Sequence, residues 1–170
     1  PGRMELIPNA LGNGDQRDLL LDGAHNEDGA AALAAALGEL APHLRDARGV
    51  NGISLVLILA VMADKSISEL TAALAVAPTL RTARVICTSV GDVRSLAPVK
   101  LATAVRAASL GAQVQIAENP SAALLAATEH HGPIVAAGSL YLVGAIRGEL
   151  IRRGAIANDG SLDDMAGSTT

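Results

Sequence analysis

Short apolar runs alternate with longer helical stretches along most of this chain of 170 residues, and this alternation constrains the fold most strongly. Each apolar run has the length of one strand, and the stretches between them carry apolar residues at helical spacing. Strand–helix–strand units of this kind build a parallel sheet, because parallel neighbours can be joined only through a crossover connection. The sequence therefore predicts a three-layer, Rossmann-like α/β domain with helices on both faces of the sheet.

The predicted sheet has about five parallel strands and one antiparallel strand at its edge. The antiparallel strand is the first one, because a polar loop containing Asn13-Gly14 joins it to the second, and this pair of residues is typical of a tight turn. The predicted strands are Met4–Ile7, Leu19–Asp22, Leu55–Ala60, Val85–Thr88, Val114–Ala117 and Ile134–Ala137.

The predicted helices follow from their apolar stripes and from the residues at their ends. Ser66 and Glu69 have the spacing of a capping box, and Asn119-Pro120 places a proline at the first helical position. The expected helices are Glu27–Leu40, Ser66–Ala77, Pro98 to about Leu110, a helix from Pro120 up to Gly132-Pro133, and Leu140–Arg152. The small, polar and acidic tail over residues 158–170 is expected to be disordered, which leaves a domain over residues 1–157.

Charge and composition exclude several classes of protein. The net charge of −4 argues against nucleic acid or an anionic membrane as the main partner, since both select a basic face. No apolar stretch is long enough to span a bilayer as a helix and no signal-peptide pattern opens the chain, so a cytoplasmic location is expected.

The only cysteine, Cys87, lies in an apolar run and is expected to be a buried hydrophobic residue. The chain therefore offers no disulfide framework or cysteine-rich metal site.

The segment from Asp22 to Asn26 is the sharpest candidate for a functional site. Right-handed crossovers bring the carboxyl ends of parallel strands to one edge of the sheet, where ligands bind. There a strand ends in Asp22, small residues let a ligand approach the backbone, and His25-Asn26 opens a helix whose N-terminus favours anions. A purely structural interpretation is equally open, with Asn26 as the N-cap, Asp22 bonded to its own turn and His25 packed at the surface.

Missing motifs narrow the choice of ligand. No Gly-x-x-x-x-Gly-Lys-[Ser/Thr] occurs, so the chain lacks a P-loop. The turn after the first parallel strand reads Asp22-Gly23-Ala24-His25-Asn26-Glu27 instead of Gly-x-Gly-x-x-Gly, which argues against NAD binding. A receiver-type signalling domain needs an acidic cluster with a phosphorylatable aspartate and a later lysine. Asp22, Asp64 and Lys65 do not fall at the strand ends in that order.

Four segments together resemble the C-terminal domain of the folylpolyglutamate synthase/dihydrofolate synthase family, which are ATP-dependent amide ligases of the Mur ligase superfamily. The resemblance runs from Pro1 to about Arg152, and the segments are Pro1-Gly2-Arg3, Asp22 to Asn26, Ala60 to Lys65 and Gly138 to Gly144. The chain departs from the family pattern at Glu27, where proline is common, at Ala145, where an acidic residue is frequent, and at Val93, where proline often precedes the arginine. None of these departures removes a residue with an expected role.

The resemblance implies a reaction for the whole enzyme. ATP would phosphorylate a carboxylate of a folate or of dihydropteroate, and the amino group of L-glutamate would attack the resulting acyl phosphate to form an amide. The nucleotide would lie between an N-terminal P-loop domain, which also supplies the Mg²⁺ ligands, and the domain present here. Because the chain opens at Pro1 without an initiator methionine, we expect it to start at the boundary of that domain. The resemblance further implies a monomer, and an isolated chain that holds no catalytic residue and is inactive.

The resemblance also assigns roles to individual residues. Arg3 and Asp22 correspond to residues that contact ATP: a guanidinium binds phosphate oxygens in a planar fork, and a carboxylate can accept hydrogen bonds from ribose hydroxyls. His25 and Ser139 correspond to positions associated with the incoming glutamate. For Ser139, capping of the following helix is an equally good interpretation.

Three further residues are candidates for lining the cleft between the domains, namely Asn26, Asp64 and Lys65. For Asp64 and Lys65, a solvated ion pair is at least as good an explanation. Two alternatives to the folate ligase stay open: the C-terminal domain of another Mur-type ligase, and a non-catalytic nucleotide-binding α/β module.

Overall fold

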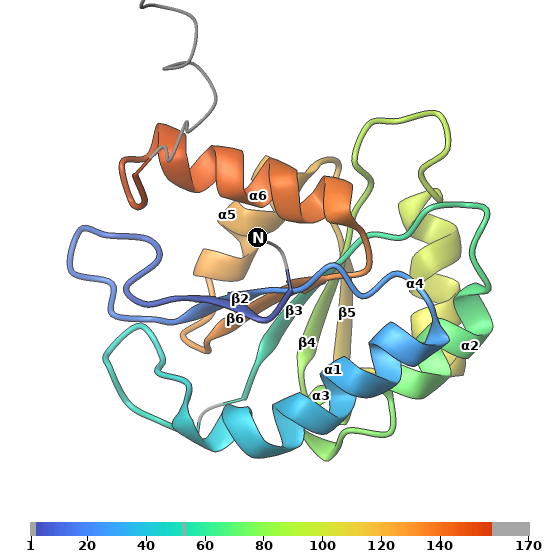
Figure 1. Ribbon diagram of the computed structural model, residues 1–170, viewed down its shortest axis with the longest axis horizontal. Coiled ribbons are helices and arrows are strands. Elements are labelled where there is room, and N and C mark those ends of the chain that lie inside the picture. Colours follow the sequence, from blue (N-terminus) through green and yellow to red (C-terminus); the bar gives the residue numbers. More distant parts are fainter. Residues whose placement is uncertain (1–2, 53, 158–170) are drawn as a thin grey trace, which may run out of the picture.

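The computed structural model describes residues 3–52 and 54–157, and this part of the chain forms one sheet covered by helices on both faces (Figure 1). The strand order is β1-β2-β6-β3-β4-β5. The strands are β1 (Glu5–Ile7), β2 (Leu19–Leu21), β3 (Val56–Leu59), β4 (Arg84–Cys87), β5 (Gln113–Ile116) and β6 (Ile134–Ala137). The pair β1–β2 is antiparallel and all other neighbouring strands are parallel, which confirms the predicted architecture.

The helices are divided between the two faces of the sheet. They are α1 (Glu27–Leu40), the 3₁₀ helix η1 (Ala41–His43), α2 (Ile67–Leu74), α3 (Pro78–Arg81), α4 (Pro98–Ala107), α5 (Pro120–Thr128) and α6 (Leu140–Arg152). In Figure 1, α5 and α6 lie on the face opposite to α1, α2 and α3. No helix in residues 3–52 and 54–157 combines the length and the apolar character needed to cross a membrane. The tail predicted to be disordered, residues 158–170, lies outside the described residues.

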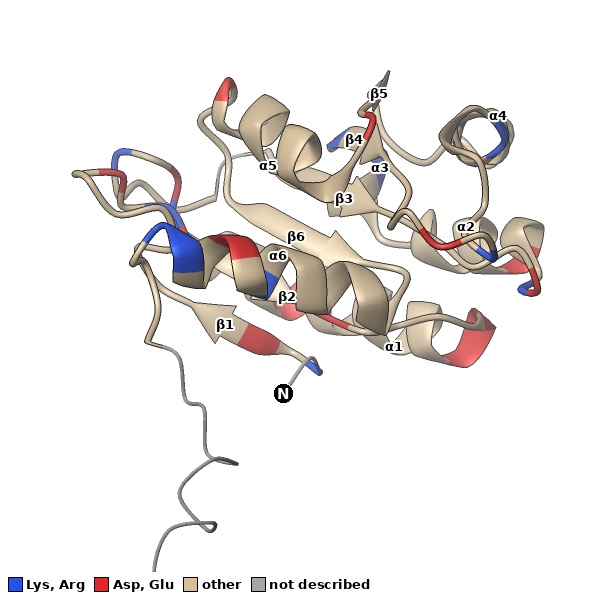
Figure 2. Cartoon of the chain, turned by 90° about the horizontal axis from the view of Figure 1, so that it is seen from above, with Lys and Arg blue, Asp and Glu red and all other residues tan. Residues whose placement is uncertain are grey.

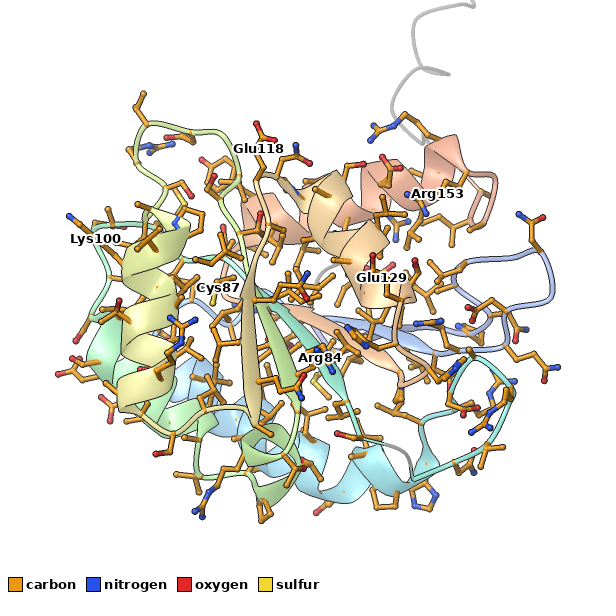
Figure 3. All side chains as sticks on the ribbon, turned by 180° about the vertical axis from the view of Figure 1, so that it is seen from behind. Arg84, Cys87, Lys100, Glu118, Glu129 and Arg153 are labelled. Carbon is orange, nitrogen blue, oxygen red and sulfur yellow. The ribbon has the colours of Figure 1, made fainter. Side chains whose placement is uncertain are left out.

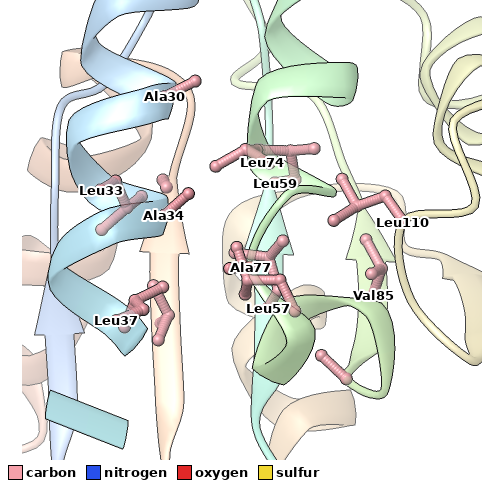
Figure 4. Close-up of a cluster of buried hydrophobic side chains, with 14 of the residues drawn as sticks. Ala30, Leu33, Ala34, Leu37, Leu57, Leu59, Leu74, Ala77, Val85 and Leu110 are labelled. Carbon is pink, nitrogen blue, oxygen red and sulfur yellow. The ribbon is translucent and has the colours of Figure 1, made fainter. Parts of the chain in front are cut away.

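The core follows from the two-residue period of the central strands. All residues of β3 are buried, and they alternate between the two apolar clusters. Leu57 and Leu59 pack in the cluster under α1 and α2, part of which Figure 4 shows, whereas Val56 and Ile58 pack in the cluster under α5 and α6. Figure 2 shows β3 and β6 free of charged side chains, as expected for strands buried on both faces.

Buried charge holds the antiparallel edge in place. Arg17, only 2% exposed, forms an ion pair with Asp15. It also donates to the carbonyl oxygens of Ala127 in the last turn of α5 (3.2 Å) and of His130 after that helix (2.7 Å). On β1 itself, Glu5 forms an ion pair with Arg147 of α6. These contacts join the first two strands to the opposite end of the chain, and the sequence pattern had not indicated them.

The helices differ from the prediction in several places. The helix expected from Pro120 up to Gly132-Pro133 ends at Thr128. The predicted helix Ser66–Ala77 ends three residues early, at Leu74, and the short helix α3, which starts at Pro78, was not predicted. Ser66 is at the N-cap position of α2, but its side chain makes no capping hydrogen bond, so the expected capping box is not formed. Helix α4 ends at Ala107 rather than near Leu110, because the chain leaves the helical conformation at Ser109, which has a φ of +53°.

Gly138 is the position where packing depends most on the absence of a side chain. It has a φ of +102°, and an added Cβ would lie 2.4 Å from the carbonyl oxygen of Ala60. In the structure this glycine lets β6 and the chain after β3 approach each other, so it shapes the site through packing.

We therefore expect Gly138→Ala to lower the free energy of unfolding by about 2 to 4 kcal/mol, because it adds both left-handed strain and a clash with backbone. The matched control is Gly144→Ala in α6, where an added Cβ meets no atom within 4 Å. That change should leave stability within about 1 kcal/mol or raise it. Urea unfolding followed by circular dichroism measures both, and equal effects of the two substitutions would contradict the packing argument.

Candidate functional site

The predicted site residues meet at the carboxyl edge of the sheet, around the ends of β2, β6 and β3. Two cavities open there, and His25 lines both. The first, of about 420 Å³, is called the Arg3 cavity, and the second, of about 580 Å³, the Tyr141 cavity. The predicted site residues in the Arg3 cavity are Arg3, Asp22, His25 and Asn26, and those in the Tyr141 cavity are His25, Asp64, Lys65 and Ser139.

Asp22 follows β2 directly and is 8% exposed. One carboxylate oxygen accepts the N–H of Met4 at 2.9 Å, and the other accepts the N–H of Ala24 at 2.8 Å. The predicted bond of Asp22 to its own turn is thus present, and a bond to the N-terminal segment accompanies it. Arg3, beside Met4, is exposed and has no hydrogen-bond or ion-pair partner among the described residues. Its guanidinium is therefore available to an anion.

His25 lies at the junction of the two cavities and is half-buried. Its Nδ1 is 2.9 Å from the carbonyl oxygen of Gly23, and because a carbonyl can only accept, Nδ1 carries the proton in this contact. The neutral ring then presents Nε2 as an acceptor. The next residue, Asn26, caps α1 by accepting the N–H of Gly29 at 2.9 Å, as the structural interpretation predicted.

Ser139 caps α6 and is 2% exposed. Its Oγ accepts the N–H of Tyr141 at 3.1 Å, and this capping bond leaves the hydroxyl hydrogen available for donation. Capping and ligand binding are therefore compatible at this residue. The N-termini of α1 and α6 both open at this edge, where their free N–H groups favour anions, although Glu27 and Asp28 in the first turn of α1 oppose this effect.

Asp64 and Lys65 form an ion pair at 3.2 Å on the wall of the Tyr141 cavity. The Asp64 side chain is 69% exposed and that of Lys65 34%, so solvent screens the pair. The solvated ion pair is therefore present, and the place of the two residues in a cleft between domains stays a prediction.

Arg94 and Tyr141 complete the Tyr141 cavity, and the sequence analysis had assigned a role to neither. Arg94 is hydrogen-bonded to Asp92 and to the Tyr141 hydroxyl (3.2 Å), and its guanidinium lies 5.8 Å from the centre of the Tyr141 ring. The hydrogen bonds that Asp92 accepts from Arg94 lower the pKa of Asp92. The pKa of Arg94 is raised, mainly by its hydrogen bond to Asp92 and secondly by that to Tyr141. The loop after β4 is thus held against the start of α6. The sequence could have pointed to Tyr141, because it is the only aromatic residue of the chain and follows Ser139 closely.

No group of three or more His, Cys, Asp or Glu side chains in residues 3–52 and 54–157 is arranged to bind a metal ion. The chemistry that this edge offers is therefore the binding of anionic and polar groups by a free guanidinium, a histidine nitrogen, a serine hydroxyl and two helix N-termini.

A doubly wound domain that gathers these groups at its carboxyl edge is a ligand-binding α/β domain of the kind found in nucleotide-dependent enzymes. Comparison with known families identifies it further. The family model described as "Dihydrofolate synthetase, C-terminal domain" matches residues 7–150, and the chain belongs to this family. Asp22, His25 and Ser139 lie inside the matched region, whereas Arg3 precedes it.

Solved structures agree with this assignment. The chain is 31% identical to Mycobacterium tuberculosis folylpolyglutamate synthase in complex with ADP, with a TM-score of 0.67 over 88% of this chain and 32% of that one. It is 28% identical to folylpolyglutamate synthase from Thermotoga maritima, with a TM-score of 0.63 over 88% of this chain and 30% of that one. E. coli FolC in complex with DHPP and ADP, at 16% identity, shares the fold with a TM-score of 0.71 over 91% of this chain and 32% of that one. The chain thus spans about a third of the length of these proteins. No curated protein sequence matches it.

Cys87 ends β4 beneath this edge, and we expect its thiol to be unreactive. Figure 3 places it within the fold, it is 0% exposed, and burial raises the pKa of the thiol to about 12 despite the nearby Arg106. Because the thiolate is the reactive form, a disulfide reagent such as DTNB should modify Cys87 only after unfolding. Labelling in native buffer, compared with labelling in urea, checks this. Rapid native labelling would mean that β4 opens to solvent.

Proposed function

We propose that the protein containing this chain is an ATP-dependent ligase that adds L-glutamate to a folate, to dihydropteroate, or to both. The proposal is carried by one observation, the gathering of Arg3, Asp22, His25 and Ser139 around two adjoining cavities at one sheet edge. Family membership supports it, since relatives named folylpolyglutamate synthase have been solved with ADP. ATP as a substrate fits a cytoplasmic enzyme.

In this proposal residues 1–157 form the C-terminal domain, and a P-loop domain elsewhere in the protein supplies the other wall of the cleft. The matched structures are about three times as long as this chain, which leaves room for such a domain. We place the Mg²⁺ ligands in that domain too, because the described residues contain no cluster suited to a metal. When bound, Mg²⁺ would neutralise charge on the phosphates.

The Arg3 cavity is the proposed nucleotide side of the site. Arg3 has a free guanidinium that can bind phosphate oxygens in bidentate geometry. The N-terminus of α1 opens beside it, and Asp22 lines the same cavity. Its carboxylate oxygens already accept two backbone N–H groups, and each oxygen keeps a lone pair that a ribose hydroxyl could use.

The Tyr141 cavity is the proposed glutamate side. It combines an acceptor, His25 Nε2, with the Ser139 hydroxyl, the N-terminus of α6 and the cations Lys65 and Arg94. Glutamate carries two carboxylates and one amino group, so a site with several donors and one acceptor suits it. Lys65 and Arg94 are paired with carboxylates of their own loops, and a substrate carboxylate could replace these partners.

The proposed reaction needs two bond exchanges at this edge. Transfer of the γ-phosphoryl group of ATP to a folate carboxylate breaks the bond between the γ-phosphorus and its bridging oxygen and releases ADP. The deprotonated amine of glutamate then forms the C–N bond and expels phosphate. The residues described here bind and orient: Arg3 holds the nucleotide, and His25 and Ser139 hold glutamate, with His25 Nε2 able to accept a hydrogen bond from its amino group.

Substitutions in the full-length protein should separate the two sides of the site. We expect Arg3→Ala to raise the KM for ATP by about tenfold or more and His25→Ala to raise the KM for glutamate similarly, as for the loss of a charge-assisted hydrogen bond. Each should leave the KM for the other substrate within about twofold. Lys100→Ala, on α4 with its side chain directed away from the sheet in Figure 3, is the control. Unchanged kinetics in both site variants would overturn the assignment.

The isolated chain should neither ligate glutamate nor hydrolyse ATP above background. Phosphoryl transfer depends on a phosphate cradle and on charge neutralisation, and the chain contains no P-loop. Release of ADP and phosphate by the purified chain, assayed beside the full-length protein, measures this. ATP-dependent glutamylation by the chain alone would contradict the proposed division of labour.

A further inference from the structure

Met4 immediately precedes strand β1 and lies opposite Asp22, which immediately follows β2. The antiparallel register pairs Glu5 with Leu21, so Met4 and Asp22 would form the next pair. Instead of continuing the ladder, the Met4 N–H donates to the Asp22 carboxylate at 2.9 Å. Met4 has a φ of +48°, which turns the preceding residue away from the sheet. This left-handed conformation is uncommon for a residue other than glycine and persists only where the surroundings hold it.

The second oxygen of Asp22 holds the loop that follows β2. It accepts the N–H of Ala24 at 2.8 Å, one residue before His25. Asp22 therefore connects two segments that are distant in sequence, the one that carries Arg3 and the one that leads into α1. Hydrogen bonds to a carboxylate are stronger than those between neutral groups. Because Asp22 is only 8% exposed, water competes little for its oxygens.

Arg3 has an exposed side chain without a hydrogen-bond or ion-pair partner among the described residues. Its backbone is attached to the domain through Met4, and the side-chain hydrogen bond that holds Met4 comes from Asp22. The location of the Arg3 guanidinium in the cavity therefore depends on the Asp22 carboxylate, which binds the backbone N–H of Met4.

We propose that Asp22 is a positioning residue, which fixes the Arg3 segment across the carboxyl edge so that the guanidinium can meet the nucleotide phosphates. The inference rests on the proposed ATP-binding role of Arg3. It adds to the ribose contact proposed for Asp22, and the two roles can be separated. A direct contact contributes to ATP binding whether or not Arg3 is present, whereas the positioning role requires Arg3.

Asp22→Asn is the substitution that separates these roles. The amide keeps the size of the side chain, and its oxygen can still accept the Ala24 N–H, but its NH₂ group would face the Met4 N–H, donor against donor. In the full-length protein, hydrogen–deuterium exchange at Met4, followed by mass spectrometry of the peptide that contains it, should accelerate by about tenfold or more. The KM for ATP should rise by about tenfold, the loss expected for one hydrogen bond to a charged group.

Glu39→Gln is the matched control. Glu39 is an exposed carboxylate near the end of α1 that lines neither cavity and has no hydrogen bond to Met4. The change also removes one negative charge from the domain, so the KM for ATP should stay within about twofold and exchange at Met4 should not change. A rise of the KM for ATP equal to that of Asp22→Asn would mean that Asp22 acts only through its charge, and the inference would be wrong.

A double-mutant cycle with Arg3→Ala decides the question. If Asp22 acts largely through Arg3, the effect of Asp22→Asn on the KM for ATP should fall from about tenfold to less than about threefold once Arg3 is alanine, although the change still accelerates exchange at Met4. A full tenfold effect in the Arg3→Ala background would overturn the positioning role and leave the proposed function intact. An Arg3→Ala protein with unchanged KM for ATP would instead overturn the proposed role of Arg3, and the inference with it.

Discussion

The insertion of β6 between β2 and β3 is the constraint on which the rest of the structure depends. The last strand of the chain pairs in parallel register with both neighbours, Ala136 lying beside Leu21 on one side and Ile58 on the other. Its carboxyl end therefore places Ser139 between the loop that carries His25 and the loop that carries Asp64 and Lys65. Gly138 makes this approach possible, since any side chain there would meet the carbonyl oxygen of Ala60.

The polar groups at this edge fall into two sets with different physical roles. Asp22, Asn26 and Ser139 are engaged with backbone N–H groups and so shape the loops and helix starts around the cavities. Arg3 and the Nε2 atom of His25 stay available to a ligand. A site of this kind places its free groups through hydrogen bonds made by their neighbours, which limits the reorganisation needed when a ligand binds.

Most of the fold could be predicted from the sequence, because buried strands and amphipathic helices have distinct periods. All the parallel strands and the antiparallel edge appear where expected, and the family resemblance is confirmed by the match over residues 7–150. The errors fall where a local rule competes with packing. Helix α2 ends at Leu74, although the apolar residues continue to Ala77, so periodicity placed its end three residues too late. The four-residue helix α3 is too short for periodicity to reveal. Ser66 has the right neighbours for a capping box, yet its side chain makes no capping hydrogen bond.

The sequence by itself determined which residues are candidates for the site. Asp22 and His25 stand out because they follow a strand and open a helix, and the family resemblance added Arg3 and Ser139. Only the tertiary structure decided how they meet. Strand order brought Ser139 beside His25, and the loop after β4 brought Arg94 against Tyr141 across 47 positions of sequence. The hydrogen bond between Met4 and Asp22 likewise joins residues 18 positions apart. Such contacts arise from the packing of whole elements, and no pattern of neighbouring residues encodes them.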